Sequence, residues 1–181
     1  MSQSKNVLVP IDFSDCAVNV VREASRAAEQ TGARVVLMHV VHVPEGLDES
    51  APVRPDRGKA PIAAIDHLLG EAERRMPEYV AAAKERNVEV SVRITHGEVV
   101  AAIVAASEES GVERIIMGTH ARKGLTKFLL GSVADQVRKL SSRPVEAIPT
   151  VHQSHCRARS CGWCATHESP AMVQLRVEQN G

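Results

Sequence analysis

The chain of 181 residues has few aromatic side chains, no excess of charge of one sign and no long apolar run. Phe, Trp and Tyr make up 2% of the residues, whereas the apolar share is 44% and is rich in Val, Ala and Ile. This composition favours a parallel sheet covered by helices over a β-sandwich. The 22 basic and 22 acidic side chains balance, so we expect neither nucleic acid nor an anionic membrane as a partner.

The sequence also lacks the segments that direct a protein into or across a membrane. No apolar stretch reaches the length of a transmembrane helix, and residues 1–5 lead into a predicted strand rather than a signal-peptide core. We therefore expect a cytoplasmic protein, in which structural disulfides are rare. Three of the four cysteines lie within the last thirty residues, in a segment with its own pattern.

Apolar runs alternate with amphipathic segments through the first 150 residues. The apolar runs predict five buried strands, over 6–10, 34–41, 88–94, 113–117 and 144–148. Helices are predicted from Ser14 to Thr31, over 62–86 with a bend at Pro77, over 97–111 and from Ser132 to 143, and a mobile loop over 44–61. This alternation predicts an α/β fold of the nucleotide-binding type, in which helices cover both faces of a five-stranded parallel sheet.

The stretch from Gly118 to Ser132 begins where an apolar strand ends and finishes where a helix starts. Glycine lets the backbone turn tightly and pass close to a bound group, and the free N–H groups of a helix N-terminus favour an anion such as phosphate. The same Ser132 also fits a capping box with Asp135, so two roles compete for its hydroxyl. The inner face of this helix is predicted to carry Val133, Val137 and Leu140.

Ligands of parallel sheets bind at the carboxyl ends of the strands, near the point where the strand order reverses. Asp12, Val40 and Gly118 all lie at predicted strand ends, so the sequence predicts a ligand site there. From spacing alone, Asp12 fits equally well a cap of the following helix or a bond to nearby backbone. His39, inside an apolar strand, is expected to be a satisfied core histidine, and Cys16 a small buried side chain.

Six segments along the chain share a pattern with a known family. They are residues 9–14, 37–41, 97, 116–120, 129–134 and 143–145. Together they make residues 5–150 resemble the universal stress protein family. The resemblance implies the strand order 3-2-1-4-5, a homodimer paired through the fifth strand, and a stress-response role exerted through a protein partner. Glu146 departs from the family pattern, because that strand is usually apolar, and we expect it to face solvent.

One branch of the family binds ATP through Gly, two residues, Gly, nine residues, Gly and Ser or Thr. Gly118, Gly131 and Ser132 match this motif, whereas Ala121 replaces its second glycine. The resemblance implies an ATP or AMP site in which Gly131 and Ser132 hold phosphate oxygens. It assigns Asp12 and the main chain of Val40 to the ribose and adenine. Pro10 and Val133 complete the expected set.

The substitution at Ala121 leaves two consequences open. Where the motif needs a positive φ, alanine costs on the order of 1 kcal/mol. Where it needs close approach of a phosphate, the methyl group obstructs the ligand. The sequence also lacks a P-loop, a nucleophile elbow and paired acid/base carboxylates, so we do not predict a fast enzyme. Slow ATP hydrolysis, with a metal such as Mg²⁺ on the triphosphate, stays an alternative.

Residues 151–181 form a Cys/His-rich tail beyond the 1–150 domain. Cys161 and Cys164 have the spacing by which a tight turn aims two thiolates at one tetrahedral ion, and zinc suits such ligands. Cys156 and His167 complete a Cys₃His set, with His152 and His155 as further candidates. The alternatives are a redox dithiol, or a tail with incidental thiols. Residues 172–178 alternate apolar and polar and predict an extra strand.

Two readings of function follow from these patterns. In the first, the protein is a stress-response module that binds an adenine nucleotide and carries a metal-binding tail. In the second, it is a metal or redox sensor on the same scaffold that has lost nucleotide binding through Ala121. The scarcity of catalytic patterns argues against an enzyme in both.

Overall fold

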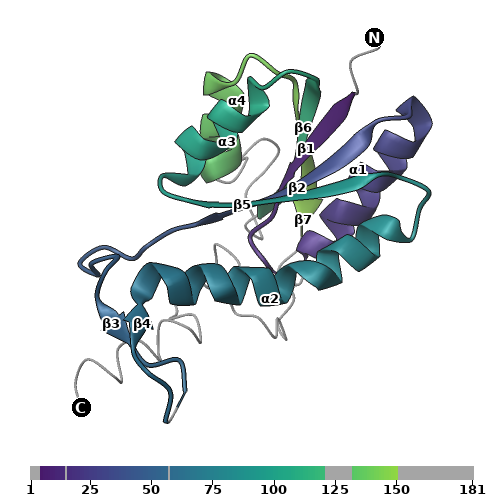
Figure 1. Cartoon of the computed structure of the whole chain (residues 1–181). Helices are drawn as coiled ribbons and strands as arrows, with labels where there is room; N and C mark the ends of the chain where they lie inside the picture. The colour runs from purple at the N-terminus through teal and green to yellow at the C-terminus, as the bar shows by residue number, and fades with distance from the viewer. Residues whose placement is uncertain (1–4, 15, 57, 121–131, 151–181) are drawn as a thin grey trace.

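The computed structural model describes residues 5–14, 16–56, 58–120 and 132–150. The main sheet has the strand order β5-β2-β1-β6-β7, and every neighbouring pair in it is parallel (Figure 1). In chain order the five strands are β1 (Asn6–Pro10), β2 (Arg34–Val41), β5 (Val90–His96), β6 (Val112–His120) and β7 (Val145–Thr150). The predicted fold class and the order third-second-first-fourth-fifth are thus confirmed.

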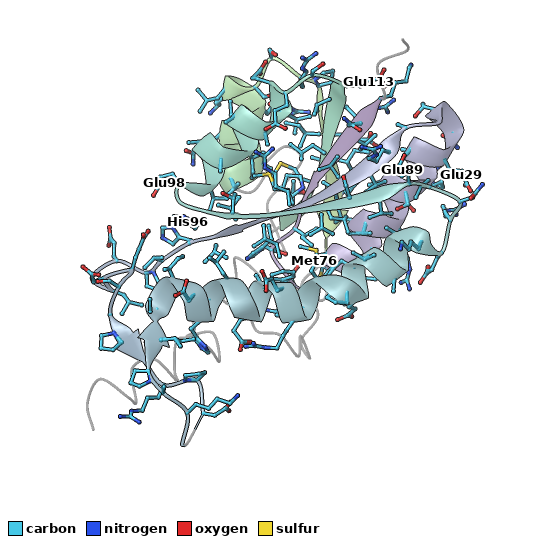
Figure 2. All side chains as sticks on the ribbon, viewed as in Figure 1. Glu29, Met76, Glu89, His96, Glu98 and Glu113 are labelled. Carbon is cyan, nitrogen blue, oxygen red and sulfur yellow. The ribbon has the colours of Figure 1, made fainter. Side chains whose placement is uncertain are left out.

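Two layers of helices enclose this sheet, as predicted. The long helices α1 (Ala17–Thr31) and α2 (Ala64–Lys84) pack together on one face, and the short helices α3 (Val99–Ser107) and α4 (Ser132–Leu140) pack on the other (Figure 1). Figure 2 shows Met76, which is 3% exposed, pointing from α2 toward the sheet. The central strands β1 and β2 are apolar on both faces because each face is covered by helices.

Glycine and proline act differently in the two long helices. α1 ends at Gly32, whose φ of 66° lets its N–H turn back toward the carbonyl oxygens of the last turn. α2 retains Pro77 inside the helix, so the proline is accommodated rather than terminating it.

The inner face of α4 differs from its prediction at one residue. Ala134 and Val137 are buried and Val133 is half-buried, but Leu140 is 64% exposed. The prediction of an inward Leu140 is wrong because this residue ends the helix. There α4 has reached the amino edge of the sheet, and no further strand surface lies under it.

A small hairpin occupies part of the segment predicted as a mobile loop, over 44–61, and the first two residues of the helix predicted over 62–86. Strands β3 (Pro52–Val53) and β4 (Ile62–Ala63) pair antiparallel and lead into α2. Val53 and Ala64 are buried there against Leu68. The prediction missed this sheet because the Pro, Gly and charged residues between the strands dominate the local pattern.

Candidate functional site

Three neighbouring strands bring the predicted site residues to one edge of the sheet. β1 lies between β2 and β6, and the Ile11 amide continues the β1–β2 ladder by donating to the Met38 carbonyl at 2.8 Å. Asp12 therefore follows β1 at the same edge at which Val40 and Gly118 lie on the flanking strands. The strand-end positions of Asp12 and Val40 agree with the prediction.

Gly118 occupies a different place from the one its motif suggested. It lies inside β6, paired with Ile148, because β6 and β7 remain paired as far as His120 and Thr150. The prediction that Gly118 opens the turn is therefore wrong, and its backbone belongs to the ladder.

Asp12 makes a bond to nearby backbone, one of the two structural roles left open by its spacing. Its Oδ1 atom accepts a hydrogen bond from the Ser14 amide at 3.0 Å, which is an Asx turn, while the residue itself is exposed. The structure therefore shows the backbone-bonded role for this aspartate.

The other predicted residues divide into described and undescribed ones. Pro10, Gly118 and Val133 are half-buried and Val40 is 8% exposed. Ser132 begins α4, but its side chain, together with Ala121 and Gly131, lies outside the described residues. All six predicted metal ligands, which are His152, His155, Cys156, Cys161, Cys164 and His167, also lie outside them.

His39 is the core histidine that the sequence predicted, and it supports the turn after β1. Its Nδ1 atom lies 2.8 Å from the Ile11 carbonyl oxygen. Burial lowers the pKa of His39, and the charge of Arg75 lowers it further, although the bond to Ile11 and the charge of Asp12 oppose this. The ring is therefore neutral at pH 7. Because the carbonyl only accepts, the proton sits on Nδ1.

Phe13 has contacts and a backbone conformation that the sequence did not indicate. Its φ is +57°, a left-handed value that is rare for a bulky side chain. Its ring lies 4.0 Å from the His39 ring and 5.4 Å from the Tyr79 ring, centroid to centroid. The carbon of the Arg75 guanidinium lies 4.7 Å from the centroid of the same ring. We call Phe13, His39, Arg75 and Tyr79 the Phe13 cluster.

Two members of the Phe13 cluster come from α2, far along the chain. The Arg75 guanidinium donates to the Phe13 carbonyl at 2.6 Å, and the Tyr79 hydroxyl donates to the Ser14 carbonyl at 3.3 Å. Local patterns carry no signal for contacts across 62 and 65 residues. The one hint was scarcity, since Phe13 and Tyr79 are two of very few aromatic residues in the chain.

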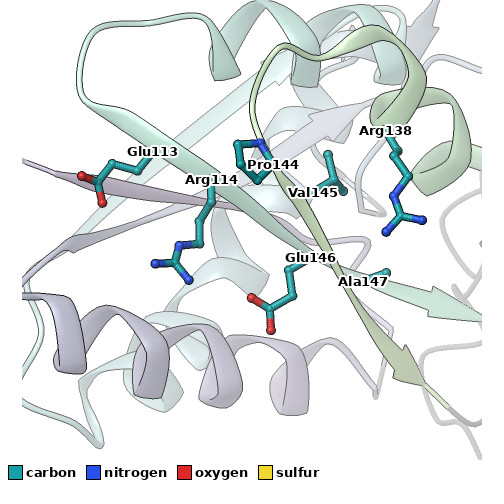
Figure 3. A pocket seen from close by; sticks show the side chains of 7 residues that line it. All are labelled: Glu113, Arg114, Arg138, Pro144, Val145, Glu146 and Ala147. Carbon is teal, nitrogen blue, oxygen red and sulfur yellow. The ribbon is translucent and has the colours of Figure 1, made fainter.

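An open cleft of about 510 Å³ lies at the outer edge of β7, away from these strand ends. Arg114 and Glu146 flank it, and Glu146 is exposed, as predicted for this edge strand (Figure 3). Among the residues that the structure describes, no group of three or more His, Cys, Asp or Glu side chains is placed to hold a metal ion. The helices in the described ranges include none that is long and apolar enough to cross a membrane.

Comparison with known proteins places this geometry in context. Residues 3–149 match the sequence profile of the universal stress protein family. Universal stress protein MJ0577 of Methanocaldococcus jannaschii is 28% identical over 155 residues, which cover 78% of this chain and 92% of that protein. Its solved structure, at 27% identity, covers 84% of this chain and 100% of its own and gives a TM-score of 0.62.

Two solved nucleotide complexes share the fold at lower identity. One is the universal stress protein from Archaeoglobus fulgidus in complex with dAMP, with 23% identity, a TM-score of 0.57 and coverage of 82% of this chain and 99% of that one. The other is a universal stress protein in complex with cAMP, with 22% identity, a TM-score of 0.58 and coverage of 81% and 98%. From the profile match over residues 3–149, this chain belongs to the universal stress protein family.

Proposed function

We propose that this universal stress protein binds an adenine nucleotide, ATP or AMP, at the carboxyl edge of its sheet and signals through a protein partner in the cytoplasm. The observation that carries the proposal is the exposed Asp12 carboxylate, oriented by the Ser14 amide at 3.0 Å between β2 and β6. Two proteins with this fold, those in complex with dAMP and cAMP, bind adenine nucleotides.

The residues at this edge suit the parts of a nucleotide. The Asp12 carboxylate would accept hydrogen bonds from the ribose hydroxyls, and the backbone of Val40 and Pro10 would lie against the adenine. The N–H groups at the start of α4, at Ser132 and Val133, would meet phosphate oxygens with Gly131, because a helix N-terminus favours an anion. A Mg²⁺ ion would arrive with ATP on its phosphates.

Isothermal titration with AMP and ATP tests this site through Asp12→Ala. We expect binding to weaken by about tenfold or more, since loss of a charged hydrogen-bonding group costs about 1.5–3 kcal/mol. Asp48→Ala is the matched control, because Asp48 makes the same kind of turn with the Ser50 amide at 2.7 Å in an exposed loop. Equal affinity in wild type and Asp12→Ala would contradict the site.

The proposal also covers the tail and the fifth strand of the sheet. We propose that residues 151–181 bind zinc through Cys161, Cys164 and further Cys and His side chains, and that β7 pairs with a second copy. The tail proposal rests on the Cys161-x-x-Cys164 spacing, and the dimer on the place of β7 at the edge of the sheet.

Native mass spectrometry of protein purified under reducing conditions tests the nucleotide, the zinc ion and the dimer at once. The expected species is a dimer that carries an adenine nucleotide and a zinc ion. A protein that responds to zinc or to an oxidant but binds no nucleotide would favour the alternative, a sensor that has lost nucleotide binding through Ala121. Release of phosphate above the buffer rate, lost in Asp12→Ala, would favour a slow ATPase.

A further inference from the structure

We infer that Arg75 and Phe13 are positioning residues of the nucleotide site, which lock residues 11–14 in one conformation and thereby fix the Asp12 carboxylate. The claim that the locked turn favours nucleotide binding rests on the proposed function, whereas the locked conformation is a property of the protein without a ligand. Neither residue belongs to the set that the family motif implies, and both act through the backbone of the turn.

The first step is the cost of the turn. Phe13 has a φ of +57°, a conformation that persists for a bulky side chain only when its surroundings over-determine it. Without those surroundings, the turn after β1 would relax toward φ values that suit phenylalanine, and the side chain of the preceding Asp12 would change direction with it.

The second step is the compensation that Arg75 supplies. Its guanidinium donates to the carbonyl of Phe13 at 2.6 Å and its central carbon lies 4.7 Å from the centroid of the same ring. One side chain therefore holds both the backbone and the ring of the strained residue. A planar guanidinium with several donors can make both contacts at once.

The third step concerns the backbone hydrogen bonds on both sides of Asp12. The Ile11 amide and carbonyl bond to Met38 and His39, and the Ser14 amide and carbonyl bond to Asp12 and Tyr79. The backbone on both sides of Asp12 is thus tied to β2 and α2. Asp12 itself remains exposed.

The test uses Arg75→Gln, with Arg74→Gln as matched control and Arg75→Lys as the conservative variant. Arg74 is the preceding residue of α2, with a side chain that is 61% exposed and paired with Glu71. Two quantities are measured on the full chain. One is amide hydrogen exchange at Ser14 without nucleotide, which reports the Asp12–Ser14 bond. The other is the dissociation constant for AMP.

We expect Arg75→Gln to speed Ser14 exchange and to weaken AMP binding by about tenfold each. Arg75→Lys should give an intermediate change of about threefold, because an ammonium group keeps the positive charge near the ring but lacks the planar group that makes both contacts at once. Arg74→Gln should change neither quantity. The pKa of His39, followed by its imidazole proton resonances, should also rise in Arg75→Gln, since Arg75 and Asp12 are the charges that act on it.

Each outcome decides a separate point. Unchanged Ser14 exchange in Arg75→Gln overturns the inference, whether or not nucleotide binds. Faster exchange with unchanged AMP affinity overturns the positioning role. Wild-type protein that binds no adenine nucleotide overturns the proposed function, while the exchange result still decides the lock. If Arg75→Gln does not fold, Arg75→Lys takes its place, and Ser14 exchange at the wild-type rate in that variant overturns the inference.

Discussion

Two turns with the same Asp-x-Ser pattern make the same local bond in different surroundings. In each, the aspartate Oδ1 accepts the amide of the serine two residues on, at 3.0 Å for Asp12 and 2.7 Å for Asp48. Residues 48–50 are all exposed, and bonds from Ser50 hold the pKa of Asp48 below its usual range. In the first turn, by contrast, Phe13 and Ser14 are only 3% and 2% exposed.

This difference separates what local sequence sets from what packing sets. The Asx bond follows from the residue types and forms in both places. The turn after β1 is held by part-buried bonds that involve side chains of a second strand and a distant helix. The exposed turn meets β5 and α2 at the surface, where His96 lies 3.6 Å from Glu49 and the Ile65 amide donates to the Glu49 carbonyl at 3.0 Å. A carboxylate on the part-buried turn is pre-organised for a ligand, whereas one on an exposed turn must be ordered when the ligand binds.

The largest difference between the turns should come from their central residues. Phe13→Ala removes a buried ring and should lower the free energy of unfolding by about 3 kcal/mol. Glu49→Ala, in the exposed turn, should change it by no more than about 0.5 kcal/mol. Urea denaturation of both variants measures this contrast. Similar losses in the free energy of unfolding of the two variants would contradict the difference between the turns.

A glycine at the same position separates the ring from the backbone strain. Phe13→Gly loses the same contacts, but glycine adopts a φ of +57° without penalty. The free energy of unfolding of Phe13→Gly should therefore be about 1 kcal/mol higher than that of Phe13→Ala. A glycine variant that is less stable than the alanine variant would contradict strain at this residue.

A smaller effect is expected from the hydroxyl that anchors the end of the first turn. Tyr79→Phe leaves the ring in place and removes the bond to the Ser14 carbonyl, which should cost about 1 kcal/mol. Ser50→Ala, which removes a hydroxyl from the exposed turn, should cost less than about 0.5 kcal/mol. Thermal denaturation of the two variants side by side distinguishes these values.

The smallest effect is the pH dependence of stability that His39, beside the first turn, should cause. The pKa of His39 in the folded protein lies below its ordinary value of 6.5, mainly because the ring is buried. Between the folded value and 6.5 the unfolded chain binds more protons, so stability falls as pH decreases through this range and is fully present above it. His39→Gln should lack this component.

Unfolding curves recorded at several pH values below 7 measure this component as the difference between wild type and His39→Gln. A wild-type protein that gains stability relative to the variant on acidification would show the opposite sign. It would place a protonated, paired His39 in the fold instead of a neutral one.

The sequence predicted the parts of this molecule that depend on local pattern or on the family. The five strands, their order and the end of α1 at Gly32 belong to this group. The hairpin β3–β4 was missed because two-residue strands have no measurable period, and Leu140 because periodicity does not reveal where the strand surface beneath a helix ends.

The positions of two candidate site residues followed from the same kind of pattern, whereas their role stays a prediction. Asp12 and Val40 lie at the expected strand ends, because the carboxyl ends of parallel strands share one edge. Arg75 was not predicted, since a contact with Phe13 from another element has no local signature. The positive φ of Phe13 was missed for the same reason, because it is stabilised by tertiary contacts and not by residue type.

The long span of the Phe13 cluster has a consequence for the order of folding. Its bonds join residue 13 to residue 75 and residue 14 to residue 79, so each closes a loop of more than sixty residues. Closing such loops lowers the entropy of the chain before the contacts can stabilise it. We therefore expect these contacts to form after the folding transition state. During synthesis, the turn that carries Asp12 must therefore wait until α2 has left the ribosome. A nucleotide bound there would slow unfolding and leave the folding rate unchanged.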